Sequence, residues 1–185
     1  RAGARASERT GAVAGATAGA SDLCLVLSRA GLHTLQVMGV PDAGSVLPKA
    51  DAVVIALKSR TIPAAQAVAM SVAAARVLRA AGAEQILFKY CSTFDSTAAG
   101  NIGPVIEALL ALTGAEVTIA CPAYPTNGRT VYMGHLFVGR QMLSDSPMRD
   151  HPLTPMTDAN LVRVMQAQRD PARGRRVGLI DYRAV

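Results

Sequence analysis

The chain has 185 residues, half of them hydrophobic and 17% of them charged, which indicates one compact globular domain and excludes a disordered or fibrous chain. Aromatic residues make up 4% of the sequence and tryptophan is absent, so no stacking platform for single-stranded nucleic acid is expected. The formal net charge of +6 is concentrated in the Arg-rich ends, residues 1–9 and 169–185. Such ends are typical of solvated termini, and no nucleic-acid partner is predicted.

Three separated cysteines, Cys24, Cys91 and Cys121, form no C-x-x-C pair. This pattern argues against a disulfide framework or a structural zinc site and favours a reducing, cytoplasmic location. The histidines lack metal-ligand spacing, so no metal site is predicted. The longest apolar stretch, residues 62–83, contains polar and charged side chains and is a poor membrane span, and no secretory signal is evident. The first residue is Arg1 rather than Met, which suggests a processed or partial product.

After a flexible lead-in over residues 1–12, short apolar runs alternate with helical patterns. Helices are predicted over 21–30, 63–82, 104–112 and 157–168, the last with Thr157 or Asp158 as its cap, and strands over 34–38, 52–57, 85–88, 116–121 and 177–180. Residues 129–138, with Gly134 near the middle, predict an inserted β-hairpin. The alternation predicts an α/β fold with a mostly parallel, Rossmann-like sheet and helices on both faces.

Ligands of such sheets bind beyond the carboxyl ends of the strands, so the loops there are the candidate sites. Residues 10–19 (TGAVAGATAG) predict either a glycine-rich strand-to-helix turn that presents backbone amides to a phosphate, or a plain start of the first helix. Lys58, Ser59 and Arg60 precede the long second helix. A hydroxyl and a guanidinium there suit carboxylate or phosphate oxygens, although Ser59 can equally serve only as a helix cap.

The most polar stretch of the chain runs from Lys89 to Asn101. It combines a lysine for anions, Asp95 as a candidate proton acceptor, and several hydroxyls before a Gly-Asn helix start. The alternative is a capped, hydrogen-bonded loop. Farther along, two prolines and Gly128 can hold Arg129 rigidly over a crevice, or form a plain proline turn.

Four blocks of sequence carry a family resemblance: LPKADAVVIALKSRTIPA (47–64), FKYCSTFDST (88–97) with GNIGPV (100–105), CPAYPTNGRTVYMGHLFVG (121–139) and MRDHPLTPMTDANLVR (148–163). Together they resemble the four-carbon acid sugar kinases, in the 3-oxo-tetronate kinase branch. The resemblance covers about residues 13–180 in order, which is far more specific than a single motif.

The resemblance implies a carbohydrate kinase, which transfers the γ-phosphoryl group of ATP to the terminal hydroxyl of a four-carbon keto acid such as 3-oxo-tetronate. Members of this family bind the sugar acid with an N-terminal domain and Mg²⁺-ATP mainly with a C-terminal domain. Residues 13–185 resemble the sugar-acid-binding domain, and the nucleotide-binding domain is expected to be absent from this chain. The implied partners are a four-carbon sugar acid and either that missing domain or a second copy, and the chain alone is expected to be an inactive kinase.

Matching the family's motifs residue by residue, together with the lysine of the polar stretch, gives two sets of candidate residues. Those implied to bind substrate are Ser59, Arg60, Lys89, Ser96, Thr97, Gly100, Asn101, Gly128, Arg129 and Thr130. The implied catalytic residues are Asp22 and Asp95.

One motif departs from the family's pattern. The family opens with Asp-Asp-x-Thr-Gly-Ala-x-Asp, whose paired acids hold the substrate hydroxyl and help to activate it. Aligned on Gly19, Ala20 and Asp22, this chain has Gly15 and Ala16 at the paired positions. The alternative is therefore a non-catalytic sugar-acid-binding module or a degenerate remnant. An oxidoreductase built on the glycine-rich turn is a weaker alternative, because no Tyr-x-x-x-Lys motif follows.

Overall fold

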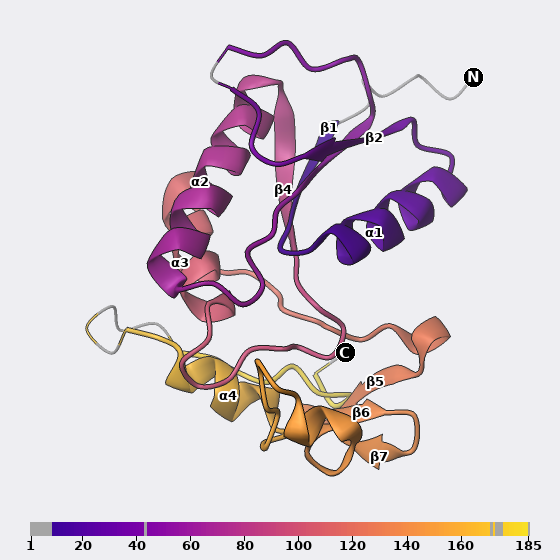
Figure 1. Cartoon of the computed structure of the whole chain (residues 1–185), viewed down its shortest axis with the longest axis vertical. Helices are drawn as coiled ribbons and strands as arrows, with labels where there is room; N and C mark the ends of the chain where they lie inside the picture. Colours follow the sequence, from indigo (N-terminus) through magenta and orange to yellow (C-terminus); the bar gives the residue numbers. More distant parts are fainter. Residues whose placement is uncertain (1–8, 43, 171, 173–175, 185) are drawn as a thin grey trace. The chain divides into compact units, whose positions relative to one another are not determined.

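Residues 9–42, 44–170, 172 and 176–184 are described by a computed structural model (Figure 1). The chain divides into two units. The first contains the residues up to Ser59 together with Ala69–Tyr90, and the second contains Arg60–Val68 and the residues from Cys91 onward.

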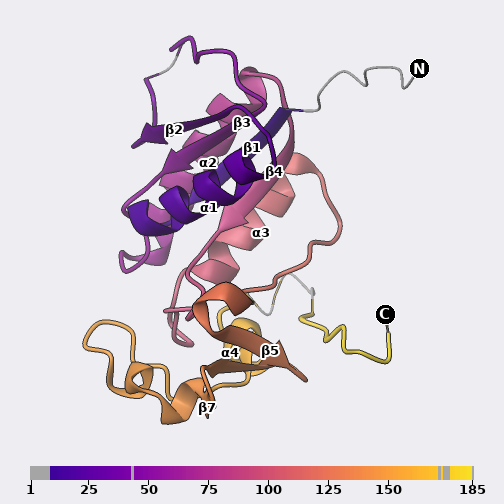
Figure 2. The same cartoon turned by 90° about the vertical axis from the view of Figure 1, so that its right-hand side faces the viewer.

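A four-stranded parallel sheet forms the first unit, with the strand order β2-β3-β1-β4 (Figure 2). The strands are β1 (Arg9–Ala14), β2 (Thr34–Met38), β3 (Ala52–Ala56) and β4 (Ala83–Lys89). Strand β3 is buried along its whole length, as is typical of a central strand in a sheet that helices cover on both faces. The predicted parallel α/β sheet is confirmed.

Two helices cover the opposite faces of this sheet (Figure 2). Helix α1 (Thr17–Arg29) packs through Ala20 on a face made of alanines and Val54. Helix α2 (Ala64–Ala80), which belongs to this unit from Ala69 onward, lies on the other face, where Gly11 meets Leu78. Neighbouring residues of a strand point to opposite faces, so small side chains along β1 let both helices come close to the sheet.

The second unit contains helix α3 (Ile102–Thr113), a three-stranded antiparallel sheet and helix α4 (Leu161–Ala167). The strands of the small sheet are β5 (Arg129–Tyr132), β6 (His135–Val138) and β7 (Gln141–Met142). Met133 and Gly134 both have a positive φ and close a tight two-residue turn between β5 and β6, so the predicted hairpin is confirmed. Tyr132 of β5 also stacks on Tyr182, with ring centroids 6.2 Å apart and planes 9° apart.

Two predicted strands are wrong. Residues 116–121 and 177–180 form no strand, and Val117, Ile119 and Ile180 are exposed. Both runs have the β-branched and apolar residues that favour strands, but this preference depends on a neighbouring strand that supplies hydrogen bonds and packing. Among the described residues, neither run has such a neighbour.

Several predicted boundaries differ from the structure. Helix α1 begins at Thr17 rather than at residue 21, and β1 begins at Arg9, inside the predicted lead-in, whose residues 1–8 lie outside the described part. The cap of α4 is Asn160, whose side-chain oxygen accepts a hydrogen bond from the Arg163 amide at 3.1 Å. Neither Thr157 nor Asp158 caps this helix.

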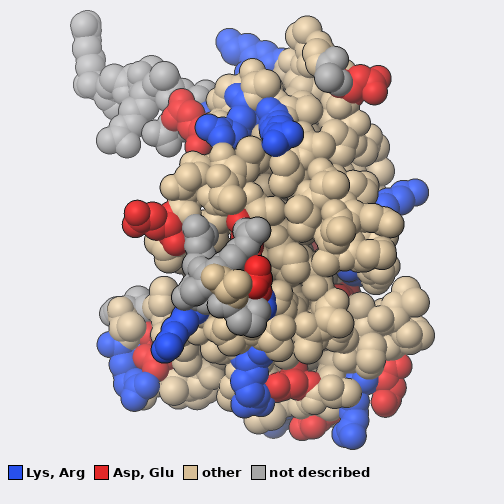
Figure 3. Space-filling view, turned by 90° about the vertical axis from the view of Figure 1, so that its left-hand side faces the viewer, with Lys and Arg blue, Asp and Glu red and all other residues tan. Residues whose placement is uncertain are grey.

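Charged side chains of both signs are interspersed on the face drawn in Figure 3. Arg163 forms an ion pair with Asp158 at 2.7 Å, and the hydrogen bond from Arg163 lowers the pKa of the Asp158 carboxyl. Within the described residues, no helix combines the length and apolarity that a bilayer span requires.

Candidate functional site

The loop that follows β4 holds Asp95 in a strained backbone conformation. Phe94 and Asp95 have φ values of 66° and 45°, which non-glycine residues rarely adopt. The buried Phe94 ring anchors the loop, and the Thr93 hydroxyl donates a hydrogen bond of 2.6 Å to Oδ1 of Asp95. Backbone strain of this kind persists only where the surroundings hold it, and it is concentrated at functional sites.

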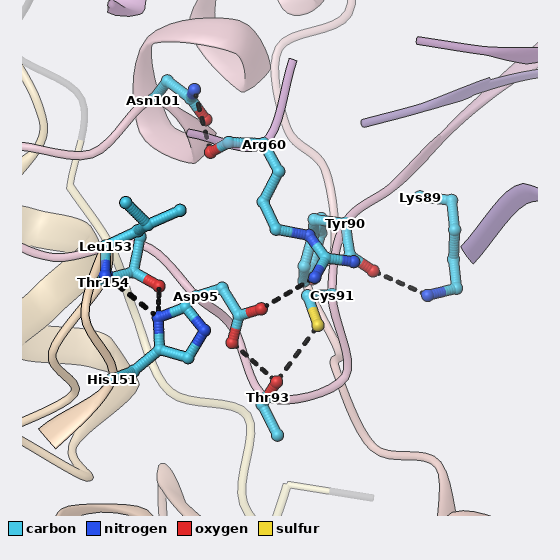
Figure 4. A network of polar contacts seen from close by, with 10 residues as sticks. All are labelled: Arg60, Lys89, Tyr90, Cys91, Thr93, Asp95, Asn101, His151, Leu153 and Thr154. Carbon is cyan, nitrogen blue, oxygen red and sulfur yellow. Dashed lines mark hydrogen bonds and ion pairs between the residues drawn. The ribbon is translucent and has the colours of Figure 1, made fainter. Parts of the chain in front are cut away.

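Arg60 forms an ion pair with this carboxylate (Figure 4). Its Nη1 donates to Oδ2 of Asp95 at 3.0 Å. The Asp95 side chain is only 3% exposed, whereas that of Arg60 is 35% exposed. A guanidinium carries five N–H donors, so the bond to Asp95 fixes its orientation while other donors remain for a ligand.

Asn101 supports the backbone of the same arginine. Its side-chain amide donates to the carbonyl oxygens of Arg60 at 3.3 Å and Ile62 at 3.1 Å. Asn101 is the N-cap of α3, but its side chain does not cap that helix. Asp95 therefore fixes the side chain of Arg60, and Asn101 fixes its main chain.

Ser96 and Thr97 are held by Gln168, a residue that the sequence analysis missed. Nε2 of Gln168 donates to Oγ of Ser96 at 2.9 Å and to the Thr97 carbonyl at 2.6 Å. Gly100 lies against the same group, since a Cβ at that position would lie 2.9 Å from Nε2 of Gln168. More than 70 residues separate Gln168 from these partners, so no local pattern reports the contact.

The loop before β5 has the backbone conformation that Gly128 predicted. Gly128 ends a short 3₁₀ helix, Pro125–Asn127, with φ at 70°. The side chain of Arg129 donates to the carbonyl oxygen of Asn127, while its buried Nε has no hydrogen-bond partner among the described residues. Thr130 is exposed on β5. Arg129 is thus held next to a rigid turn.

In the first unit, the glycine-rich stretch forms the predicted strand-to-helix turn between β1 and α1. The amide of Gly15 donates to the Lys89 carbonyl at 3.0 Å, and the Ser59 amide donates to the Gly15 carbonyl at 3.0 Å. Lys89 Nζ donates to the Tyr90 carbonyl at 2.6 Å. Gly15, Ser59 and Lys89 therefore come together at the carboxyl ends of three strands, while Asp22 lies farther along α1 and is partly buried.

The predicted site residues thus fall into two groups. The first unit contains Asp22, Ser59 and Lys89. The second unit contains the other predicted residues, namely Arg60, Asp95, Ser96, Thr97, Gly100, Asn101, Gly128, Arg129 and Thr130. Hydrogen bonds join Arg60, Asp95 and Asn101 into one network, whereas Arg129 and Thr130 belong to β5.

The chain resembles known proteins over nearly its whole length. The chain is 58% identical over 177 residues to the 3-oxo-tetronate kinase of Cupriavidus necator, and 59% identical over 176 residues to that of Methylobacterium radiotolerans. Each match covers 95% of this chain and 40% of the relative. The chain therefore spans about two fifths of the length of these curated relatives.

Solved structures share the fold. A Haemophilus influenzae protein of the DUF1537 family is 51% identical, with a TM-score of 0.82 over 85% of this chain and 38% of its own. A DUF1537 domain from Bordetella bronchiseptica, described as a domain-swapped dimer with bound citrate, is 28% identical, with a TM-score of 0.72 over 84% of this chain and 39% of its own. Residues 12–185 match the family described as "Sugar-binding N-terminal domain", and the chain belongs to that family.

Proposed function

We propose that this chain is the substrate-binding part of a 3-oxo-tetronate kinase and that it binds a four-carbon sugar acid. The observation that carries the proposal is the pair of Arg60 with the buried Asp95, which presents a partly exposed guanidinium in a fixed orientation. The family match and the names of the relatives support the same substrate class.

The proposed contacts follow from the chemistry of the ligand. A sugar acid offers a carboxylate, which suits the planar donors of Arg60, and hydroxyls, which suit Ser and Thr side chains. Asp95 balances much of the arginine's charge, so recognition depends on the direction of the N–H donors as well as on attraction. We assign the hydroxyls of Ser96, Thr97 and Thr130, and the Arg129 guanidinium, to the rest of the ligand.

Asp95 is the carboxylate that we propose for proton transfer from the substrate hydroxyl, and Asp22 of the first unit is the alternative. Both oxygens of Asp95 already accept hydrogen bonds, one from Arg60 and one from Thr93. Each of these oxygens has a second lone pair, which can accept a hydrogen bond from a substrate hydroxyl beside Thr93 or in its place. The Thr93 hydroxyl has a second neighbour at 3.0 Å, Sγ of Cys91, to which it can turn.

The family resemblance implies that Mg²⁺-ATP is bound mainly by a second domain. No group of three or more His, Cys, Asp or Glu among the described residues could hold a metal ion. We therefore assign nucleotide binding to the part of the relatives that this chain does not match, and the proposal for this chain concerns the sugar acid alone. Its proposed partner in phosphoryl transfer is that nucleotide-binding part or a second copy of the chain, in the cytoplasm.

A second candidate function is a sugar-acid-binding module without catalysis. The presence of Gly15 and Ala16 at the positions of the paired acids favours it. Both candidates require the chain to bind the ligand, and they differ in whether a supplied nucleotide-binding domain restores phosphoryl transfer.

Calorimetric titration of the chain with 3-oxo-tetronate, or with the stable analogue threonate, tests the proposal. We expect binding without ATP, and a loss of about tenfold in affinity, or about 1.4 kcal/mol, in Arg60→Gln. Gln keeps a polar side chain with N–H donors at this partly exposed position, which limits damage to the fold. The control is Arg163→Gln, which removes an exposed arginine that pairs with Asp158.

Two results would refute this assignment. One is a chain that is folded by circular dichroism yet binds no four-carbon acid at millimolar concentration. The other is an equal loss of affinity in Arg163→Gln and Arg60→Gln.

A further inference from the structure

Gln168 directly follows α4 and bonds to two segments that lie far from it in the sequence. Its Oε1 accepts a hydrogen bond from the Gly103 amide at 2.7 Å, and its Nε2 donates to Ser96 and Thr97. We propose that Gln168 is a positioning residue that sets the loop of residues 93–97 against the first turn of α3 and thereby sets the affinity for the sugar acid. The ligand in this inference rests on the proposed function.

The side chain of Gln168 uses both halves of its amide. It is buried, its oxygen acts as the acceptor for α3, and its nitrogen acts as the donor for the loop. Glutamate of the same length would keep the acceptor and lose the donor, and methionine of similar size would lose both. Among side chains of this length, therefore, only glutamine satisfies the two segments together.

Two glycines make room for this contact. A Cβ at Gly103 would lie 2.9 Å from Cβ of Gln168, and one at Gly100 would lie 2.9 Å from its Nε2. Glycine is unfavourable inside a helix, and Gly103 lies in the first turn of α3. Close approach of Gln168 accounts for a glycine at that position.

The contact reaches the candidate site through neighbours in the chain. Ser96 directly follows Asp95, which fixes the guanidinium of Arg60. Asn101, which fixes the Arg60 backbone, lies between Gly100 and Gly103. Gln168 thus contacts the chain next to Asp95 and next to Asn101, the two residues that fix Arg60. A shift of the Gln168 side chain therefore changes the direction of the N–H donors of the arginine.

The next residue fixes Gln168 in turn. Nε of Arg169 donates to Oε1 of Glu107 on α3 at 2.7 Å, and the two side chains are 7% and 10% exposed. Helix α4 has seven residues, too few to be stable alone, so its position depends on such tertiary contacts. The buried pair anchors the end of α4 against α3.

Two substitutions at Gln168 separate its bonds. Gln168→Glu keeps the acceptor for Gly103 and removes the donor to the loop, whereas Gln168→Met removes both. The control is Gln166→Met, an exposed position in the last turn of α4, where Oε1 of Gln166 accepts a hydrogen bond from the Val177 amide. Each variant is titrated with threonate, and its amide hydrogen exchange is followed by NMR.

The amides of Gly100 and Gly103 report on the two segments. Gly100 donates to the Thr97 carbonyl within the loop, and Gly103 donates to Gln168 itself. In Gln168→Glu we expect about tenfold weaker threonate binding, faster exchange at Gly100 and unchanged exchange at Gly103. In Gln168→Met both amides should exchange faster, and Gln166→Met should match the unmodified chain in both measurements.

An amide-exchange rate at Gly100 equal to that of the wild type in both Gln168 variants would overturn the inference. Faster exchange at Gly100 together with wild-type affinity for threonate would overturn it as well. If Gln168→Met does not fold, the Glu variant alone decides. If the folded wild-type chain binds no sugar acid, the proposed function fails. The exchange at Gly100 and Gly103 then decides whether Gln168 positions the loop.

Discussion

The two units of the chain hold their polar loops in different ways. In the first unit, hydrogen bonds between backbone groups hold the loops. The Leu57 amide donates to the Ala14 carbonyl, and the Ser59 amide donates to the Gly15 carbonyl. The Gly15 amide donates to the Lys89 carbonyl. In the second unit, side chains hold the loops, through Asp95, Asn101 and Gln168. Backbone hydrogen bonds tolerate changes of side chain, so the turn of the first unit can lose its acidic residues and keep its shape. A side-chain network, in contrast, cannot lose a member without leaving a polar partner unpaired.

Removing a buried charge should destabilise the second unit more than any other change that we propose. Glu107→Ala leaves the buried guanidinium of Arg169 without its carboxylate, and we expect a loss of about 3–5 kcal/mol in the free energy of unfolding, measured with urea. Asp158→Ala, which breaks the exposed pair with Arg163, is the control and should cost far less. Equal losses in the two variants would contradict the role assigned to the buried pair.

Crowding the glycines of the second unit should have the next largest effect. A Cβ at Gly100 would overlap Oγ of Ser96 and would lie 2.9 Å from the Thr97 carbonyl oxygen. We expect Gly100→Ala to lower the free energy of unfolding by about 1–3 kcal/mol. The control is Gly178→Ala, where no heavy atom lies within 4 Å of the added carbon. Thermal unfolding that ranks the control as the more damaged variant would contradict this expectation.

The turn of the first unit should accept acids without damage. Ala16 is the N-cap of α1, has extended backbone angles and makes no side-chain cap, so Ala16→Asp should raise the free energy of unfolding by about 1 kcal/mol. At Gly15 an added Cβ would lie 3.6 Å from Oγ of Ser59, an ordinary contact. We therefore expect the double variant, with Gly15→Asp as well, to fold in urea titrations as stably as the unmodified chain or more so.

The same double variant sharpens the functional comparison. If paired aspartates at positions 15 and 16 hold the substrate hydroxyl, the double variant should bind threonate several-fold more tightly than the unmodified chain, as measured by calorimetry. Ala18→Asp adds one charge near the same helix end without restoring the pair, and it should leave the affinity unchanged. An equal gain in threonate affinity in the double variant and in Ala18→Asp would mean that added charge, rather than the pair of acids, causes the tighter binding.

Cysteine reactivity gives the smallest expected effect. Burial raises the pKa of the Cys24 thiol, and a backbone hydrogen bond offsets part of this shift. A raised pKa leaves less thiolate at pH 8, so Cys24 should react with iodoacetamide more slowly than the exposed Cys121, and its rate should still be rising above that pH. Peptide mass mapping over time measures both rates. Faster labelling of Cys24 would mean that α1 does not stay packed on the sheet.

The difference between the units also explains how much the sequence predicts. Alternating apolar runs and helices report a parallel sheet, because backbone pairing and burial leave a periodic pattern. The same rule points to the polar loops at the strand ends, and it predicts Ser59, Asp95 and Asn101 as candidate residues. The pairing of Arg60 with Asp95 and the position of Gln168 join residues 35 and more than 70 apart, and no periodicity encodes such contacts. The strands predicted over 116–121 and 177–180 failed because a strand depends on its neighbour as well as on its own residues.

The stacked rings of Tyr132 and Tyr182 give the chain an optical signal of its own. Tryptophan is absent and there are four tyrosines, so tyrosine dominates the near-ultraviolet dichroism and the emission. Two rings 6.2 Å apart and almost parallel should couple strongly. Loss of this signal on titration with ligand or denaturant would therefore time the departure of the segment around Tyr182 from β5, without any added label.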